Sequence, residues 1–165
     1  ALKLAPLVFV RPGELRTAEW KDINLTTAEW RYSVSKTRSG GVAEHIVPLS
    51  RQAVEILAEL RPLTGGGRYV FPSPTSADRP MSNNAVLAAF RRMGVGTDEM
   101  TGHGWRATAR TLIEEVLGYQ PHIIEQQLAH VVRDPLGRAY NRTTHLDTRR
   151  TMMQAWADYL ETLRK

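Results

Sequence analysis

The chain has 165 residues, 42% of them hydrophobic and 24% charged, a composition typical of one globular domain. No apolar run approaches the roughly 20 residues of a membrane helix, so we expect no membrane partner. The absence of cysteine excludes a disulfide framework, a Cys-type zinc site and thiol catalysis. The net charge of +5 weakly favours a polyanionic partner such as nucleic acid.

The chain opens at Ala1 inside an apolar stretch and has no initiator Met. We therefore expect it to be a piece of a longer protein. The sequence shows no secretory signal pattern, which is consistent with a cytoplasmic location.

The first half of the chain alternates between helical and extended patterns. Residues 2–9 are typical of an apolar helix end or a buried segment, and the proline at position 12 predicts a helix over about 12–20. Alternating large apolar residues predict a strand over 29–35, and residues 44–49 are the expected returning strand. The polar, glycine-containing segment 36–41 predicts the hairpin connection between them.

The second half is predicted to be almost entirely helical. Segment 72–80 is expected to be a loop. Helices are expected after Ser50, from Ser82, from the segment 101–106, after Pro121 and over residues 145–163. The predicted fold class is α+β, predominantly α-helical, with a small antiparallel β-sheet near the N-terminus, in one domain covering residues 1–165.

His103 and Arg106 are three residues apart at the start of a predicted helix. That spacing puts both side chains on one face, near the unpaired N–H groups of the first turn, where a phosphate binds well. A capping histidine beside a solvated arginine explains the spacing equally well.

Arg11 also precedes the start of a predicted helix, so two arginines could hold two oxygens of one phosphodiester. Glu14 could orient the guanidinium, although an exposed ion pair is the simpler interpretation. Lys36 lies at the end of a strand and could donate a proton to a leaving oxygen, but such a lysine is usually only solvated. Arg38 is a second candidate cation in the same hairpin.

Tyr140 stands between Arg138 and Arg142, ten residues after His130. Tyrosine has a free pKa of about 10 and is a poor nucleophile at neutral pH, but nearby cations that bind the substrate's oxygens lower the barrier. Taken alone, an incidental surface tyrosine is the simpler interpretation.

Other chemistries lack their motifs. The histidines at 103, 122 and 130 are not accompanied by a His-Glu-x-x-His helix or an aspartate cluster, so no metal site is expected. The glycine run 65–67 lacks the Gly-Lys-Ser/Thr ending of a nucleotide-binding loop, and no cofactor is expected.

Five motifs in chain order resemble the catalytic domain of the tyrosine recombinases, the phage integrase family. They are Arg11 in Val-Arg-Pro-Gly-Glu-Leu, Lys36 in a hairpin, His103-Gly-Trp-Arg106, Leu-Ala-His130, and Tyr140 in Ala139-Tyr-Asn-Arg142. The segments 46–50, 69–72 and 101–108 further resemble prophage and genomic-island integrases. Two positions differ from many relatives: Ala107 replaces a second histidine, and Ala129 stands where glycine is common.

The resemblance implies a role for each residue. Tyr140 would be the nucleophile that forms a 3′-phosphotyrosine, and Arg11 and Arg106 would stabilise the transition state. Lys36 would protonate the leaving 5′-oxygen, and His103 would take the proton of the tyrosine. His130 would hydrogen-bond the phosphate.

The resemblance also implies partners and a domain context. The chain would be the C-terminal catalytic domain of a site-specific integrase, without upstream arm-binding and core-binding domains. Its partners would be double-stranded DNA at attachment sites, other protomers in a synaptic tetramer, and an excisionase or host DNA-bending protein. A type IB topoisomerase-like enzyme and a catalytically silent DNA-binding remnant of a prophage integrase are the alternatives.

Overall fold

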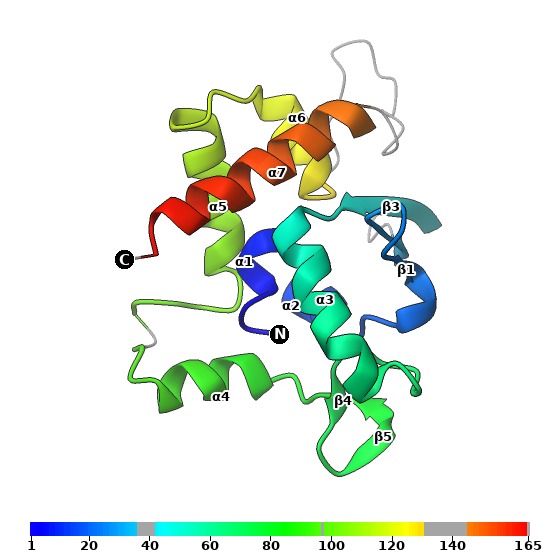
Figure 1. Cartoon of the computed structure of the whole chain (residues 1–165). Helices are drawn as coiled ribbons and strands as arrows, with labels where there is room; N and C mark the ends of the chain where they lie inside the picture. Colours follow the sequence, from blue (N-terminus) through cyan, green and yellow to red (C-terminus); the bar gives the residue numbers. More distant parts are fainter. Residues whose placement is uncertain (36–41, 97, 131–144, 165) are drawn as a thin grey trace.

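The computed structural model describes residues 1–35, 42–96, 98–130 and 145–164, and it confirms the α+β class (Figure 1). The elements in chain order are α1 (Ala5–Val8), α2 (Pro12–Arg16), the 3-10 turn η1 (Trp20–Asp22), β1 (Ile23–Asn24), β2 (Glu29–Ser35), β3 (Val42–Pro48), α3 (Arg51–Thr64), β4 (Pro72–Ser73), β5 (Ser76–Pro80), α4 (Ala85–Arg92), α5 (Gly104–Glu115), α6 (Pro121–Gln127) and α7 (Leu146–Thr162).

The N-terminal sheet is antiparallel with strand order β1-β2-β3, and Trp30 of β2 pairs with Val47 of β3. Alternation along β2 buries Trp30 and Val34 on the core side, while Arg31 and Ser33 are exposed. The predicted strand and its return are therefore confirmed, although β3, expected over 44–49, begins at Val42 and ends at Pro48.

The first predicted helix is shorter than the sequence indicates. It ends at Arg16, and the Thr17 hydroxyl donates to the carbonyl of Gly13 at 2.9 Å. Beyond it the chain pairs with a distant segment, because Val70 N–H donates to the Ala18 carbonyl at 2.9 Å and Trp20 N–H to the Arg68 carbonyl at 3.0 Å. A backbone that is committed to this pairing cannot continue as a helix.

The expected loop 72–80 is instead the hairpin β4–β5. Its second strand, Ser76–Pro80, carries no buried residue, so it lacks the apolar–polar alternation by which a half-buried strand is recognised. Short polar strands of this kind are formed by backbone pairing alone.

The core is organised around α1, a short apolar helix that contacts α3, α5 and α7 (blue in Figure 1). Val8 and Phe9 are fully buried, and the Phe9 ring meets the Trp156 ring edge-on at 6.4 Å. Trp156 Nε1 donates to the Pro6 carbonyl at 2.8 Å, which ties α7 to α1. This packing places the segment after α1, which carries Arg11, against the ends of α5 and α6.

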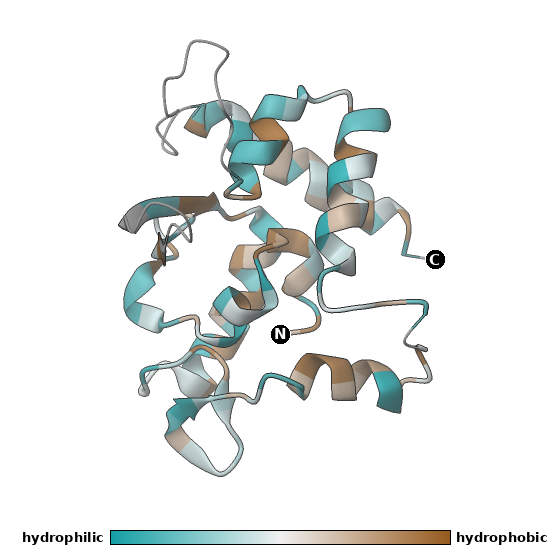
Figure 2. Ribbon diagram, turned by 180° about the vertical axis from the view of Figure 1, so that it is seen from behind, coloured by the Kyte–Doolittle hydropathy of each residue, from teal (hydrophilic) through white to brown (hydrophobic). Residues whose placement is uncertain are grey.

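Helix α4 lies at one end of the molecule and carries a run of apolar residues (Figure 2). Its Phe90 is buried against the ring of Trp105 at 6.3 Å. Within the described ranges, no helix combines the length and the hydropathy that crossing a bilayer requires.

Candidate active site

Arg106, in the first turn of α5, is a buried arginine that joins two distant parts of the chain. Its Nη1 donates to the carbonyl of Phe9 at 2.8 Å, and its Nη2 donates to the carbonyl of Leu128 at 2.7 Å. Nη2 also lies 3.2 Å from Nε2 of His130. The guanidinium is therefore fixed between the end of α1 and the end of α6.

The Phe9 carbonyl is positioned by an uncommon backbone conformation. Phe9 is the C-cap of α1 and has φ 33°, in the left-handed region that costs a bulky residue energy. This conformation turns the chain out of α1 towards Arg11. A strained backbone conformation persists only where the surrounding packing holds it. The strained residue here, Phe9, presents its carbonyl to the Arg106 guanidinium.

Burial lowers the pKa of Arg106, and the positive charge of Arg11 lowers it further. Arg106 donates to the carbonyl of Phe9, two residues before Arg11, so the two arginines lie close together although they are 95 positions apart in the sequence. Like charges that are held together repel each other, and an anion that binds both relieves that repulsion.

Arg11 is held by Glu14, one turn along the chain. The Glu14 carboxylate accepts the Arg11 backbone N–H at 2.8 Å through Oε2 and the Arg11 Nη1 at 2.9 Å through Oε1. The Tyr32 hydroxyl donates to the same Oε2 at 2.9 Å. The Arg11 side chain remains 40% exposed, so its charge stays accessible to solvent.

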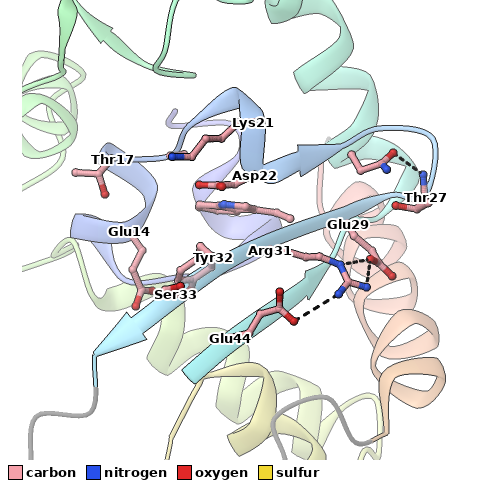
Figure 3. A pocket seen from close by; sticks show the side chains of 13 residues that line it. Glu14, Thr17, Lys21, Asp22, Thr27, Glu29, Arg31, Tyr32, Ser33 and Glu44 are labelled. Atoms are coloured by element: carbon pink, nitrogen blue, oxygen red, sulfur yellow. Dashed lines mark hydrogen bonds and ion pairs between the residues drawn. The ribbon is translucent and has the colours of Figure 1, made fainter. Parts of the chain in front are cut away.

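Glu14 and Tyr32 lie together on the wall of a pocket of about 770 Å³ that is lined by residues of α2, η1 and the N-terminal sheet (Figure 3). Burial is the main cause that raises the pKa of Tyr32, and the Glu14 carboxylate raises it further. Tyr32 is therefore a neutral hydrogen-bond donor to Glu14.

His103 is the N-cap of α5, and its carbonyl accepts the Arg106 N–H at 3.0 Å. Its imidazole is exposed and makes no capping hydrogen bond. The preceding Gly102 packs on the first turn of α2, since a Cβ there would lie 3.2 Å from Cγ of Pro12. The start of α5 is thereby brought next to Arg11.

His130 follows the end of α6 and is exposed on the same side as Arg106. Its Nδ1 lies 2.5 Å from Oε2 of Glu125, and Oε1 of Glu125 accepts from Nε of Arg110 at 3.2 Å. Both ring nitrogens thus have charged partners.

The structure brings four of the six predicted site residues into one region: Arg11, His103, Arg106 and His130. Lys36 and Tyr140, and the alternative cation Arg38, lie outside the described residues.

Two residues of this region, Tyr32 and Glu125, were not predicted as site residues, and of the two interpretations of Glu14 the structure supports the one in which it orients the Arg11 guanidinium. Glu14 binds Arg11 and Tyr32 instead of forming a simple exposed pair, and its position three residues after an N-cap is the spacing of a capping box. Glu125 is five residues before His130, a spacing that becomes informative only once the end of α6 is known. Tyr32 has no local signal.

Known proteins resemble this chain over most of its length. The sequence profile of the Phage integrase family matches residues 1–146. The chain is 39% identical over 155 residues to the Prophage integrase IntA of Escherichia coli (strain K12), which covers 94% of this chain and 37% of that protein. It is 41% identical over 173 residues to the Integrase of Enterobacteria phage P4, which covers 98% of this chain and 39% of that protein. The chain thus spans less than half the length of these relatives.

Solved structures of recombinases share the fold. The XerA recombinase aligns over 99% of this chain and 55% of its own with a TM-score of 0.61 at 16% identity. A lambda integrase (75–356) dimer bound to a COC′ core site aligns over 84% of this chain and 52% of its own with a TM-score of 0.54 at 21% identity. From the extent of the profile match and the identity to the prophage integrases, we conclude that the chain belongs to the phage integrase family.

Proposed function

We propose that residues 1–165 are the C-terminal catalytic domain of a site-specific DNA recombinase that integrates and excises mobile DNA. The observation that carries the proposal is the convergence of three distant parts of the chain at Arg106, which lies 3.2 Å from Nε2 of His130 and donates to the carbonyl of Phe9, two residues before Arg11. Three groups able to bind an anion at one place suit a single phosphodiester.

In the proposed reaction the Tyr140 oxygen attacks the scissile phosphorus, and the bond from phosphorus to the 5′-oxygen breaks. His103 accepts the tyrosine proton, and Lys36 protonates the leaving oxygen to give a free 5′-hydroxyl. Arg11 and Arg106 stabilise the charge on the non-bridging oxygens in the transition state, with His130 as a further donor. The 3′-phosphotyrosine keeps the energy of the bond, and attack by a 5′-hydroxyl reverses each step.

The partners we propose follow from the same family. One solved neighbour is the Tn1549 transposon integrase in complex with circular intermediate DNA, and another is a lambda integrase tetramer bound to a Holliday junction. For this chain we propose double-stranded DNA at attachment sites and further protomers as partners. An excisionase or a host DNA-bending protein would set the direction, and the reaction would take place on DNA in the bacterial cytoplasm. The arm-binding and core-binding domains would lie upstream.

The proposal is tested with the intact integrase on a nicked duplex that carries the attachment site of its element and traps the covalent intermediate. We expect a covalent protein–DNA adduct without added metal, and none with Tyr140→Phe. An adduct that persists in Tyr140→Phe would contradict the assignment of the nucleophile.

Two other outcomes identify the alternatives. Relaxation of a supercoiled plasmid without an attachment site would indicate a topoisomerase-like enzyme. DNA binding with no adduct would indicate a catalytically silent remnant.

A further inference from the structure

Glu125, at the end of α6, connects His130 to a second helix. One carboxylate oxygen lies 2.5 Å from Nδ1 of His130, and the other accepts from Nε of Arg110 in α5 at 3.2 Å. Arg110 also donates to Glu114 at 2.6 Å. The carboxylate is 27% exposed, so it is partly shielded from water between two nitrogen groups.

The backbone at the end of α6 places Glu125 and His130 together. His130 N–H donates to the Glu125 carbonyl at 3.0 Å, and Ala129 N–H donates to the Gln126 carbonyl at 3.0 Å. Ala129 has φ 54°, in the left-handed region. These are the two hydrogen bonds and the left-handed residue of a Schellman motif, in which the side chains of Glu125 and His130 occupy the two positions that commonly contact each other.

The partners of His130 determine its protonation pattern in the free protein. A guanidinium has donors and no acceptor, so the Arg106 Nη2 that lies 3.2 Å from Nε2 requires a lone pair on Nε2. The proton of the neutral ring is then on Nδ1, which donates to the Glu125 carboxylate. The ring is thus held from one side by an anion and faces the Arg106 guanidinium on the other.

We propose that Glu125 is a positioning residue for the strand-cleavage reaction, acting through His130. This rests on the proposed function, in which His130 binds the scissile phosphate. Glu125 fixes the direction of the His130 ring through Nδ1, so that Nε2 points to the place beside the Arg106 guanidinium where the phosphate would bind, while Arg110 holds the carboxylate in place.

The first test is a spectroscopic one on the protein without DNA. We expect long-range ¹H–¹⁵N spectra, which detect the ring nitrogens through the carbon-bound ring protons, to give His130 an Nδ1 resonance of the protonated type, because Nδ1–H donates to the Glu125 carboxylate. Glu125→Ala should abolish this resonance. The matched control is Glu114→Ala, which removes another partner of Arg110 without touching His130, and it should keep the resonance.

The second test is single-turnover cleavage of the nicked attachment-site substrate by the intact integrase. Glu125→Ala is expected to reduce the rate about tenfold, the size of a lost hydrogen bond to a charged group, and Glu125→Gln should reduce it less because the amide oxygen still accepts. In a His130→Ala background, Glu125→Ala should have no further effect, since its action passes through the missing ring.

The proposal is overturned if the Nδ1 resonance is absent from the wild-type protein or survives Glu125→Ala. It is also overturned if Glu125→Ala lowers the cleavage rate equally with and without His130. Should Glu125→Ala fold poorly, Glu125→Gln replaces it, and a rate equal to that of the wild type would then contradict the proposal. Absence of any Tyr140 adduct in the wild type would instead contradict the proposed recombinase, while the spectrum would still decide whether Glu125 holds His130.

Discussion

Arg11 and Arg106 meet at one place but differ in how firmly they are held. Arg106 is buried and bonded to two carbonyls, so it is a fixed part of the site. Arg11 is 40% exposed and is anchored by the Glu14 carboxylate. Because Glu14 binds the Arg11 guanidinium only through Nη1, the other N–H groups of this guanidinium can bind a ligand. The position of the Glu14 carboxylate therefore sets the direction of the Arg11 side chain.

The Tyr32 hydroxyl is predicted to influence cleavage through Glu14. Tyr32→Phe keeps the ring contacts with Trp30 and His45 but removes the 2.9 Å hydrogen bond to Glu14. A hydrogen bond to a carboxylate contributes about 1.5 kcal/mol, so we expect a single-turnover cleavage rate about tenfold lower. The loss of the same bond should lower the midpoint of thermal unfolding by a few degrees.

The matched control is Tyr159→Phe in α7, a half-buried tyrosine that stacks near Trp156. It should leave the cleavage rate unchanged. Equal rates for Tyr32→Phe and the wild-type enzyme would show that Glu14 holds Arg11 without this hydroxyl.

The site is built from the ends of elements. Arg11 precedes α2, Arg106 lies in the first turn of α5, and His130 closes the motif that ends α6. The directions of these side chains depend on the backbone conformation of the few residues at each helix end. A substitution at a helix end can therefore change the stability of the fold without changing the site residues themselves.

Ala129 is expected to be replaceable by glycine with a gain in stability. Its φ of 54° is unfavourable for a residue with a Cβ, whereas glycine adopts it at little cost. Ala129→Gly should therefore raise the free energy of unfolding by about 1 kcal/mol, measured by urea denaturation.

The matched control is Ala107→Gly on the exposed face of α5, where the backbone is helical. It should lower the free energy of unfolding by about 1 kcal/mol. A destabilised Ala129→Gly variant would contradict the left-handed conformation at the end of α6.

Arg149 is expected to be a major stabilising contact of α7. It is fully buried, donates to Oε1 of Gln127 at 2.7 Å and 3.0 Å and to the carbonyl of Ile46, and burial lowers its pKa to about 10. Arg149→Met leaves these buried oxygens without their donor, so we expect a loss of roughly 3 kcal/mol in chemical denaturation.

Arg51→Met is the control for the loss of an arginine. Arg51 is 58% exposed and pairs with Glu55 and Glu161 at the surface. Such exposed pairs contribute less than about 1 kcal/mol, so the denaturation midpoint of Arg51→Met should stay close to the wild-type value. A similar small effect of Arg149→Met would show that its buried contacts add no net stability.

For the whole molecule, the charge predicts salt-sensitive DNA binding. The net charge is +5, and phosphate contacts release counterions, so affinity for a duplex should fall as salt rises. Residues 1–165 on their own should bind weakly and with little sequence preference, because phosphate contacts carry no sequence information. Arg11→Ala should make the slope of log affinity against log salt less steep by about 1, measured by fluorescence anisotropy.

The control for Arg11→Ala is Arg164→Ala, which removes the same charge at a position beyond the end of α7. It should leave the slope almost unchanged. Equal slopes for the Arg11→Ala variant and the wild type would place Arg11 away from the bound phosphates.

The sequence alone determined the elements and the family. Helix caps and strand alternation are encoded within a few neighbouring residues, so most helices and the first sheet could be predicted. The order of the motifs around Arg11, Arg106 and His130 was enough to indicate the family. The early end of α2 was missed because it results from backbone pairing with a distant segment. The β4–β5 hairpin was missed because its second strand has no apolar face.

Only the tertiary structure decided how the site residues are held. Arg106 bonds to carbonyls 97 and 22 positions away, and Tyr32 reaches Glu14 across 18 positions. No local pattern specifies such contacts, because they exist only after α1, α5, α6 and the sheet have packed around one core. The pairing of Glu125 with His130 lies between these cases: the residues are five apart, but the left-handed turn at Ala129 brings their side chains together.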